Sequence, residues 1–538
     1  MSYQGFMSRV STEAQDLYDI KNEAAEFYRV NGVPEEIERA LNELFFNKPE
    51  DVHGYLANYF TNLSAPPRIS RLKGREVYDA RGQLAIETEV FCIICNKEKV
   101  KLMIYILPFW PFLVKISTGE RADHVMTAAQ WINEPLNNML KGQNPCDQSD
   151  VDHILSNFFM ARYLEEKDIQ NKEKEESRSP SEAEVVLSSP LSAQTKDKKS
   201  VDKGKKSNTA EKSFPPAEPP EPVLPGSLAI GSVSLAVAKT GAKTQGIPLY
   251  KYIAVPTQFH IPVSLVTLLS CGKTSPGKLT LLEEVILIPK AGQRVKQILT
   301  MTLELQKEMM RIVDTSTKAM LCDSGVLAVN YERPEQPLDL ITEACTNFGL
   351  ALGTEIHLAV HCAAPELMDY SKGKYEIATG VLKSPDELVD LYQTLISKYP
   401  AVVALIDPFR REDIDQWEKL SNVIRNSCSL LSDITYKSKA PPLPGVRGHI
   451  LKHIHETTVS DLICITSEHQ GNTSTEAKAG PRSAVDITLP AVGLGLDYIK
   501  LGGLRSADTM TKFNRLISIE EELAQQGILG TFLYSSLV

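Results

Sequence analysis

The stretch Ala401-Val-Val-Ala-Leu-Ile-Asp-Pro-Phe409 decides the fold class of this chain. It begins as an apolar run with the length of a buried β-strand, and Asp407-Pro408 ends the run because proline has no amide proton to give to a strand ladder. Upstream, Ser384-Pro-Asp-Glu387 predicts a helix start, with serine as the N-cap and proline at the first helical position. A helix followed by a buried strand is the unit of a βα barrel, whose sites lie at the carboxyl ends of its strands.

Residues 254–538 repeat this alternation. Strands and helices that alternate at this density imply a parallel βα barrel, within a chain of the α/β class. The strand-like and helical runs are Thr280–Pro289, Val295–Val313, Leu338–Phe348, Glu355–Cys362, Glu387–Lys398, Ala401–Leu405, Ser429–Ile434, Ile450–Lys452, Leu462–Thr466 and Tyr498–Leu501.

Length and composition exclude several classes of protein. At 538 residues the chain is long enough for two or three domains, and its net charge of −10 argues against a nucleic-acid partner. Leu102–Val114, the most apolar window, is too short to cross a bilayer, and the N-terminus lacks the apolar region of a signal peptide. Nine cysteines, an odd number, predict reduced thiols in the cytoplasm. Cys92 and Cys95 form an isolated pair, so core packing is favoured over zinc, which needs four ligands.

Residues 1–66 are predicted to form a small helical module. Two short helices cannot bury both of their faces alone, so pairing with a second copy would complete a core. The string from Lys48 to Leu63 resembles the dimerisation-and-docking helices of kinase regulatory subunits, which implies an anchoring partner. The alternative is a helical appendage packed on its own protein. The apolar residues at helical spacing are Ile37, Ala40, Leu41 and Leu44, then Val52, Leu56, Tyr59, Phe60 and Leu63.

Residues 67–164 and 225–253 are predicted to form an α+β domain that precedes the barrel, interrupted by residues 165–224. The interruption consists of Glu/Lys runs, Ser-Pro pairs and the proline-rich string Pro215–Pro222, with almost no aromatic residues. Such a composition cannot offset the entropy lost on ordering, so we expect this segment to be disordered.

Four strings resemble motifs of the enolase family, the phosphopyruvate hydratases. They are the opening hairpin at Arg75–Glu87, the segment Gly231–Ile253, the segment Gly373–Phe409 and the final helix Lys512–Leu523. The resemblance spans residues 75–538 without the insert, and it implies an enolase-type barrel with an N-terminal α+β capping domain. Together with the docking-like module it is most like the divergent sperm branch of animal enolases, which implies a cytoplasmic protein of the sperm flagellum.

The resemblance also implies an activity and a cofactor. Enolases dehydrate 2-phospho-D-glycerate to phosphoenolpyruvate in glycolysis, with a lysine base and Mg²⁺. The three carboxylates that hold the metal in the family fall at His361, Ile406 and Ser432 in this chain. Asp407 and Asp433 follow two of these positions, but strand alternation predicts that they point to the opposite face. The residues present therefore predict that the family's metal site is lost.

Three substrate-site positions survive by resemblance. Lys452 matches the base, Lys500 matches the lysine that stabilises the intermediate and also contacts the substrate, and Glu284 matches a substrate-side glutamate. Ser117 matches the serine of a mobile loop that helps to hold a second magnesium ion in the family.

Other positions of the family's site are changed. The general-acid glutamate is replaced by Ser324, and a site histidine is replaced by Ser275. The phosphate-binding arginine is replaced by His469, in a predicted loop that starts at Ser467; histidine is charged only below neutral pH and lacks the planar fork of arginine. The helix expected between Lys452 and this loop is largely missing, which indicates a remodelled barrel segment.

His449, His453 and His455 have a spacing found in zinc sites. No cysteine or fourth histidine lies nearby in the sequence, so a loop is favoured over a metal site.

Two functions remain open from the sequence. One is an enolase in which Lys452 abstracts the alpha proton, Lys500 stabilises the intermediate and Glu284 orients substrate or water, with Mg²⁺. The other is a catalytically weak or inactive enolase-fold scaffold in a cytoskeletal or flagellar assembly, anchored through residues 1–66. A homodimer or a mixed dimer with another enolase subunit is expected, with neither a nucleic acid nor a membrane as a partner.

Overall fold

The computed structural model describes residues 12–78, 82–106, 118–176, 224–254, 259–271, 280–316, 320–322, 325–362, 364–378, 380–433, 441–451, 456–471, 482–485 and 488–529. The chain divides into two compact units, Met1–Arg68 with Ile93–Lys99 and Ile69–Cys92 with Val100–Val538. In the described part of the chain, no helix has the length and apolar character needed to cross a membrane.

Helices make up most of the first unit: α2 (Thr12–Val30), α3 (Val33–Asn47) and α4 (Val52–Leu63). The two predicted amphipathic helices are confirmed as α3 and α4, whereas α2 was not predicted. Helix α4 begins where it does because the Asp51 carboxylate accepts the Gly54 amide at 2.8 Å, as an N-cap does.

A sheet with strand order β1-β2-β3 and a set of helices precede the barrel. Side-chain amides satisfy part of the free edge of β1, because Asn133 exchanges two hydrogen bonds of 2.9 Å with the backbone of Gly74 and Asn137 accepts the Leu72 amide at 2.7 Å. The elements are β1 (Arg68–Tyr78), β2 (Leu84–Ile94), β3 (Lys97–Ile106), α5 (Thr118–Trp131), the π-helical turn η1 (Ile132–Leu136), α6 (Asn137–Leu140), α7 (Gln148–Glu176), α8 (Leu228–Thr244) and α9 (Leu249–Tyr252).

Helix α7 extends further than the sequence predicts. It runs to Glu176, so the expectation of disorder is wrong for residues 165–176, which are rich in Glu, Lys and Gln and therefore favour a helix. The rest of that predicted segment up to residue 223 lies outside the described residues.

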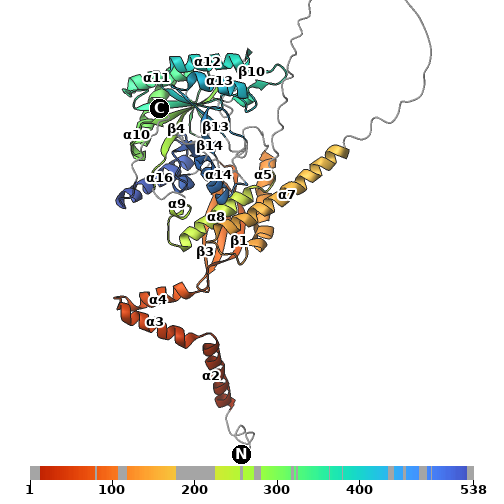
Figure 1. Ribbon diagram of the computed structural model, residues 1–538, viewed down its shortest axis with the longest axis vertical. Helices are drawn as coiled ribbons and strands as arrows, with labels where there is room; N and C mark the ends of the chain where they lie inside the picture. Colours follow the sequence, from red (N-terminus) through yellow and green to blue (C-terminus); the bar gives the residue numbers. More distant parts are fainter. Residues whose placement is uncertain are drawn as a thin grey trace, which may run out of the picture. The chain divides into compact units, whose positions relative to one another are not determined.

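The barrel is a closed ring of strands in the order β16-β15-β14-β13-β12-β8-β5-β4, with β16 paired to β4. Figure 1 shows helices of this region, among them α10 to α13 and α16, around the strands. The predicted barrel is confirmed, but β5 pairs antiparallel with both of its neighbours, so the prediction of a fully parallel barrel is wrong. Residues 271–281 separate β4 from β5, which is too few for the helical crossover that a parallel pair needs.

The strands and helices of the barrel alternate as the sequence predicts over most of its length. They are β4 (Val263–Ser270), β5 (Leu282–Pro289), α10 (Val295–Ser316), α11 (Gln336–Phe348), β8 (Ile356–Cys362), α12 (Pro385–Lys398), β12 (Val402–Ile406), α13 (Ile414–Ile424), β13 (Ser429–Asp433), β14 (Val446–Leu451), α14 (Val459–Gly471), β15 (Arg482–Val485), α15 (Thr488–Gly493), β16 (Tyr498–Gly502) and α16 (Ala507–Gln525). Short elements outside the ring are β6 (Met320–Leu321), β7 (Leu327–Ala328), η2 (Ala364–Glu366), β9 (Met368–Asp369), β10 (Lys374–Ala378) and β11 (Val381–Lys383).

Strand β12 is buried on both of its faces. Val402 and Leu405 belong to the large cluster shared with the surrounding helices, whereas Ala404 and Ile406 belong to a smaller cluster inside the barrel. A strand covered on both faces is a continuous apolar run in the sequence, which is why this stretch predicts a barrel strand.

The start of α12 confirms the predicted N-cap. The Ser384 hydroxyl accepts the Glu387 amide at 3.2 Å, and the Ser384 amide donates to the Glu387 carboxylate at 2.7 Å. This reciprocal pair is a capping box, which fixes where the helix begins before it leads into β12.

The segment after β14 differs from the prediction. Residues 459–471 form α14, so Leu462–Thr466 and Ser467 are helical, and the helix predicted to be missing is present. It begins at Thr458, whose amide and hydroxyl donate to the Asp461 carboxylate at 3.0 and 2.7 Å. This N-terminal cap is visible in the sequence as Thr458-Val-Ser-Asp461, and the next strand of the ring is β15.

Candidate functional site at the barrel mouth

Strand pairing brings the three predicted ligand positions to neighbouring strand ends. His361 of β8 pairs with Ile406 of β12, and Ile406 pairs in turn with Leu431, the residue before Ser432 in β13. Each of the three ligand positions is the last or next-to-last residue of its strand. The barrel mouth, defined here by Glu283, Glu284, His361, Asp407 and Lys500, lies at these ends.

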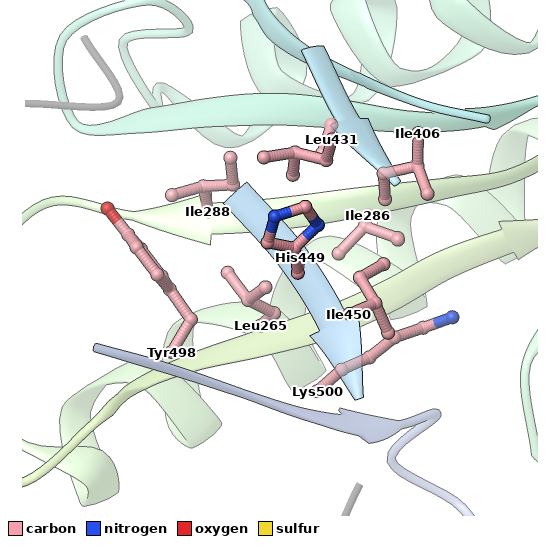
Figure 2. A pocket seen from close by; sticks show the side chains of 10 residues that line it. Leu265, Ile286, Ile288, Ile406, Leu431, His449, Ile450, Tyr498 and Lys500 are labelled. Carbon is pink, nitrogen blue, oxygen red and sulfur yellow. The ribbon is translucent and has the colours of Figure 1, made fainter. Parts of the chain in front are cut away.

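Ile406 faces a small apolar cavity inside the barrel (Figure 2). Its side chain is 2% exposed, and a carboxylate in its place would be stripped of water among aliphatic neighbours. Leu431 lines the same cavity, whereas Ser432 is buried and is not among the lining residues. The remaining lining residues are Leu265, Ile286, Ile288, Ala359, His449, Ile450, Tyr498 and Lys500.

His361 lies between two carboxylates. Its Nδ1 is 3.7 Å from Glu283 Oε2, and its Nε2 is 3.8 Å from Asp407 Oδ2. These are distances of ion pairs rather than of hydrogen bonds. Burial opposes a charged ring, but Asp407 and then Glu283 attract the proton, and together they raise the pKa of His361 above its ordinary value.

A bulge in β5 brings two consecutive glutamates to the mouth. The pairing of β5 with β8 shifts between Leu282 and Glu284, and such a bulge removes the strict alternation of side chains. Glu284 forms an ion pair with Lys500 of β16, while Glu283 faces His361. Burial raises the pKa of Glu283, and His361 acts in the opposite direction.

Asp407 does not point to the opposite face as strand alternation predicts. Strand β12 ends at Ile406, and Asp407 has a φ of 47°, in the left-handed region. Its carboxylate therefore reaches His361 and also accepts the Asp433 amide at 3.1 Å. The prediction is wrong for Asp407 because this residue has already left the strand.

A buried polar network holds the turn that follows β12. The Tyr392 hydroxyl donates to the carbonyl of Pro408 at 3.0 Å. The Arg410 guanidinium donates twice to the Asp413 carboxylate, at 2.7 and 3.2 Å. Tyr375 donates to Asp413 and accepts the Arg410 amide, so both charges of this pair are satisfied away from water.

The donors at the mouth do not fit Mg²⁺. This ion needs several oxygen ligands in near-octahedral order, and the three predicted ligand positions offer one imidazole, one aliphatic chain and one hydroxyl. Glu283 and Asp407 face His361, and Glu284 faces Lys500. Within the residues that the structure describes, no three His, Cys, Asp or Glu side chains are grouped so as to hold a metal ion.

The structure brings together only part of the predicted site. Lys500 and Glu284 meet at the mouth, and their roles remain predictions. His469 lies in α14 rather than in the predicted loop, so the loop prediction is wrong, and its assignment to the phosphate stays a prediction. The predicted residues that lie outside the described part of the chain are Ser117, Ser275, Ser324 and Lys452, together with His453 and His455.

Sequence reasoning did not assign Glu283 and Asp407 to the mouth. Glu283 is the first residue of a Glu-Glu pair at the start of a strand, where a bulge can bring both side chains to one end. Asp407 precedes a proline that ends its strand, and this break was the signal that alternation no longer applies there.

Comparison with known proteins identifies the family. Residues 258–439 match the family described as the C-terminal TIM barrel domain of enolase. The chain is 49% identical to enolase 4 of Danio rerio, over 98% of this chain and 96% of that protein. It is 40% identical to enolase 4 of Homo sapiens, over 97% of this chain and 91% of that protein. It is 29% identical to the enolase of Methanopyrus kandleri, over 57% of this chain and 74% of that protein. The chain therefore belongs to the enolase family.

Proposed function

We propose that this chain is a structural member of the enolase family that does not dehydrate 2-phospho-D-glycerate at the rate of an enolase. The observation that carries the proposal is Ile406, which is buried in the wall of an apolar cavity at a position where the family needs a metal-binding glutamate. An aliphatic side chain there can neither bind a cation nor exchange a proton.

The charges at the mouth support the same conclusion. Removing a proton next to a carboxylate builds up negative charge that cations must stabilise, and metal ions supply several kcal/mol of that stabilisation. The cationic side chains at the mouth, His361 and Lys500, already lie against carboxylates. We therefore expect turnover at least about a thousandfold below that of an enolase with intact ligands.

A second candidate function is glycolytic enolase activity itself. The pair of Lys500 and Glu284 supports it, because both residues match family positions and lie together at the mouth. In this case Lys452 would act as the base, Lys500 would stabilise the intermediate and Glu284 would orient substrate or water, with Mg²⁺ bound by other residues than those of the family.

A turnover assay on the purified full chain separates the two functions. The structural proposal predicts only trace formation of phosphoenolpyruvate from 2-phospho-D-glycerate at millimolar MgCl₂, and this trace should be insensitive to Lys500→Ala. An enolase-like rate that Lys500→Ala abolishes would establish the enzyme and refute the structural proposal.

For attachment, we propose that residues 1–66 pair with a second copy of the module and bind an amphipathic helix of an anchoring protein. Exposed apolar side chains in the described helices support this role, since contiguous apolar surface marks interaction sites. They include Leu17, Phe27, Ile37, Leu41, Phe45, Phe46, Val52, Phe60 and Leu63. The proposed setting is a cytoskeletal assembly in the cytoplasm, such as that of the sperm flagellum, with a homodimer or a mixed enolase dimer as the building block.

Leu56→Asp tests the pairing of the module. A charge in the apolar seam should shift the full chain towards a smaller species in sedimentation velocity, because a carboxylate is costly to bury. Asn58→Asp, on the exposed side of α4, is the matched control and should leave sedimentation unchanged. The same profile for Leu56→Asp as for the wild type would count against the proposal.

A further inference from the structure

The mouth carries an excess of acidic groups in a part of the barrel with little access to water. The side chains of Glu283, His361 and Asp407 are 7%, 17% and 19% exposed, and the Glu284 and Lys500 side chains are similarly covered. Carboxylates in such surroundings need a counter-charge. In the enolase family a divalent metal ion supplies it, and the donors here do not fit that ion.

His361 is placed to supply this counter-charge. It lies in β8, between the Glu283 bulge of β5 on one side and the Asp407 turn after β12 on the other. Its two ring nitrogens face different carboxylates, at 3.7 and 3.8 Å. A neutral imidazole has a proton on one nitrogen only, whereas an imidazolium has a proton on both, so this arrangement suits the charged ring.

We propose that His361 is a resident cation, which joins β5, β8 and the turn after β12 through Glu283 and Asp407, so that the barrel mouth assembles without a divalent metal ion. This inference rests on the proposed function, since a mouth that still bound catalytic Mg²⁺ would not need it. The raised pKa of His361 supports the charged state. Lys500, which lowers that pKa, is itself neutralised by Glu284.

The same geometry explains why Mg²⁺ should not displace the ring. A protonated imidazole has no lone pair for a metal, and its charge repels a second cation from Glu283 and Asp407. If the ring loses its charge, the buried Glu283 is left without its counter-charge. Removing one partner of a buried pair in this way is strongly destabilising.

Melting temperatures of four full-length proteins, with millimolar MgCl₂ and with EDTA, test the proposal at neutral pH. His361→Gln keeps the size and polarity of the ring but not its charge, and it should melt about 5–10 °C below the wild type. His361→Lys restores a cation and should recover more than half of that loss. His357→Gln is the control, because burial lowers the pKa of His357 on the same strand; it should melt within about 2 °C of the wild type.

MgCl₂ should leave all four melting temperatures unchanged. Equal melting of His361→Gln and the wild type, or a rise of the wild-type melting temperature with MgCl₂, would overturn the proposal. If His361→Gln is insoluble and His361→Lys is soluble, the result supports the proposal. If both variants are insoluble, the proposal is overturned. An enolase rate in the same samples would refute the proposed function, while the melting temperatures would still test the charge at residue 361. Melting temperatures that do not depend on that charge would refute the resident cation and leave the proposed function standing.

Discussion

The barrel mouth has two sides, which differ in how closely their residues match those of the enolase family. On one side, Lys500 of β16 and Glu284 of β5, which match family positions by resemblance, form an ion pair with each other. On the other side, the ends of β8, β12 and β13 carry His361, Ile406 and Ser432, where the resemblance to the family predicts metal-binding carboxylates. If the predicted positions are right, the difference has a physical reason. Opposite charges that neutralise each other are stable without a metal ion, whereas neighbouring carboxylates that need a metal ion between them are not.

The side that carries His361, Ile406 and Ser432, called the replaced half below, has stabilising contacts of its own. Ile406 joins the apolar interior, His361 supplies a positive charge, and Asp407 turns out of its strand to meet it. Each change suits a barrel that is stable without a bound ion. The following predictions test how far the two halves differ, from the largest expected effect to the smallest.

The largest effect on stability is expected when carboxylates are placed at all three predicted ligand positions. The triple variant His361→Asp, Ile406→Glu, Ser432→Asp removes one cation and adds three acidic groups, two of them at fully buried positions and one at the partly buried position 361. In EDTA we expect the free energy of unfolding to fall by about 5 kcal/mol or more, since buried charges without partners are costly. MgCl₂ should restore several kcal/mol, because an ion that binds the folded state stabilises it. Urea unfolding with and without MgCl₂ measures both effects.

Two single changes serve as controls for the triple variant. Ile406→Val should cost about 0.5–1.5 kcal/mol and give no response to MgCl₂. Ser432→Asp alone should also lack the response, because Mg²⁺ needs several ligands at once and His361 stays between Glu283 and Asp407. A triple variant as stable in EDTA as the wild type would show that these residues do not occupy the ligand positions.

The replaced half should also lose stability when the buried polar network after β12 is broken. Asp413→Ala leaves the buried Arg410 without its carboxylate, and we expect a loss of about 3–5 kcal/mol in the free energy of unfolding. Asp386→Ala is the control, because its ion pair with Lys419 is more than half exposed and should contribute less than about 1 kcal/mol. Similar losses for the two variants in urea unfolding would refute the supporting role of the network.

The smallest expected effect is the pH dependence of the His361 contribution. Its pKa is raised in the folded state, so its stabilisation is complete below the unfolded-state pKa of about 6.5 and is lost as pH rises through the folded-state value. The groups that act on the ring are Glu283, Glu284, Asp407 and Lys500. The difference in melting temperature between the wild type and His361→Gln should therefore shrink as pH rises above about 6.5. A difference that stays constant would show that the ring contributes by packing alone.

The sequence predicts the fold well where one local rule decides the structure. The apolar run before Asp407-Pro408 and the cap at Ser384 are both confirmed, because burial on two faces and capping leave clear patterns. Strand direction was harder to predict: β5 is antiparallel because of the short connection before it, and an apolar run has no direction. The short apolar pattern of this segment does not predict helix α14, whereas the cap formed by Thr458 and Asp461 does.

The site could be predicted only in part. Family motifs located Lys500 and Glu284, which meet in the structure, and they identified the positions of His361 and Ile406 at neighbouring strand ends. The approach of Asp407 and Glu283 to His361 depends on a left-handed residue and on a bulge, which are decided by pairing between strands and not by the local sequence.

Titration calorimetry of MgCl₂ into the metal-free full chain tests the central claim most directly, because it measures binding whether or not any chemistry follows. A mouth that is neutralised by its own residues should give no saturable heat up to millimolar Mg²⁺, and the triple variant should gain a saturable signal under the same conditions. Stoichiometric binding of Mg²⁺ by the wild type, abolished by charge changes at Glu283 or Asp407, would contradict the account.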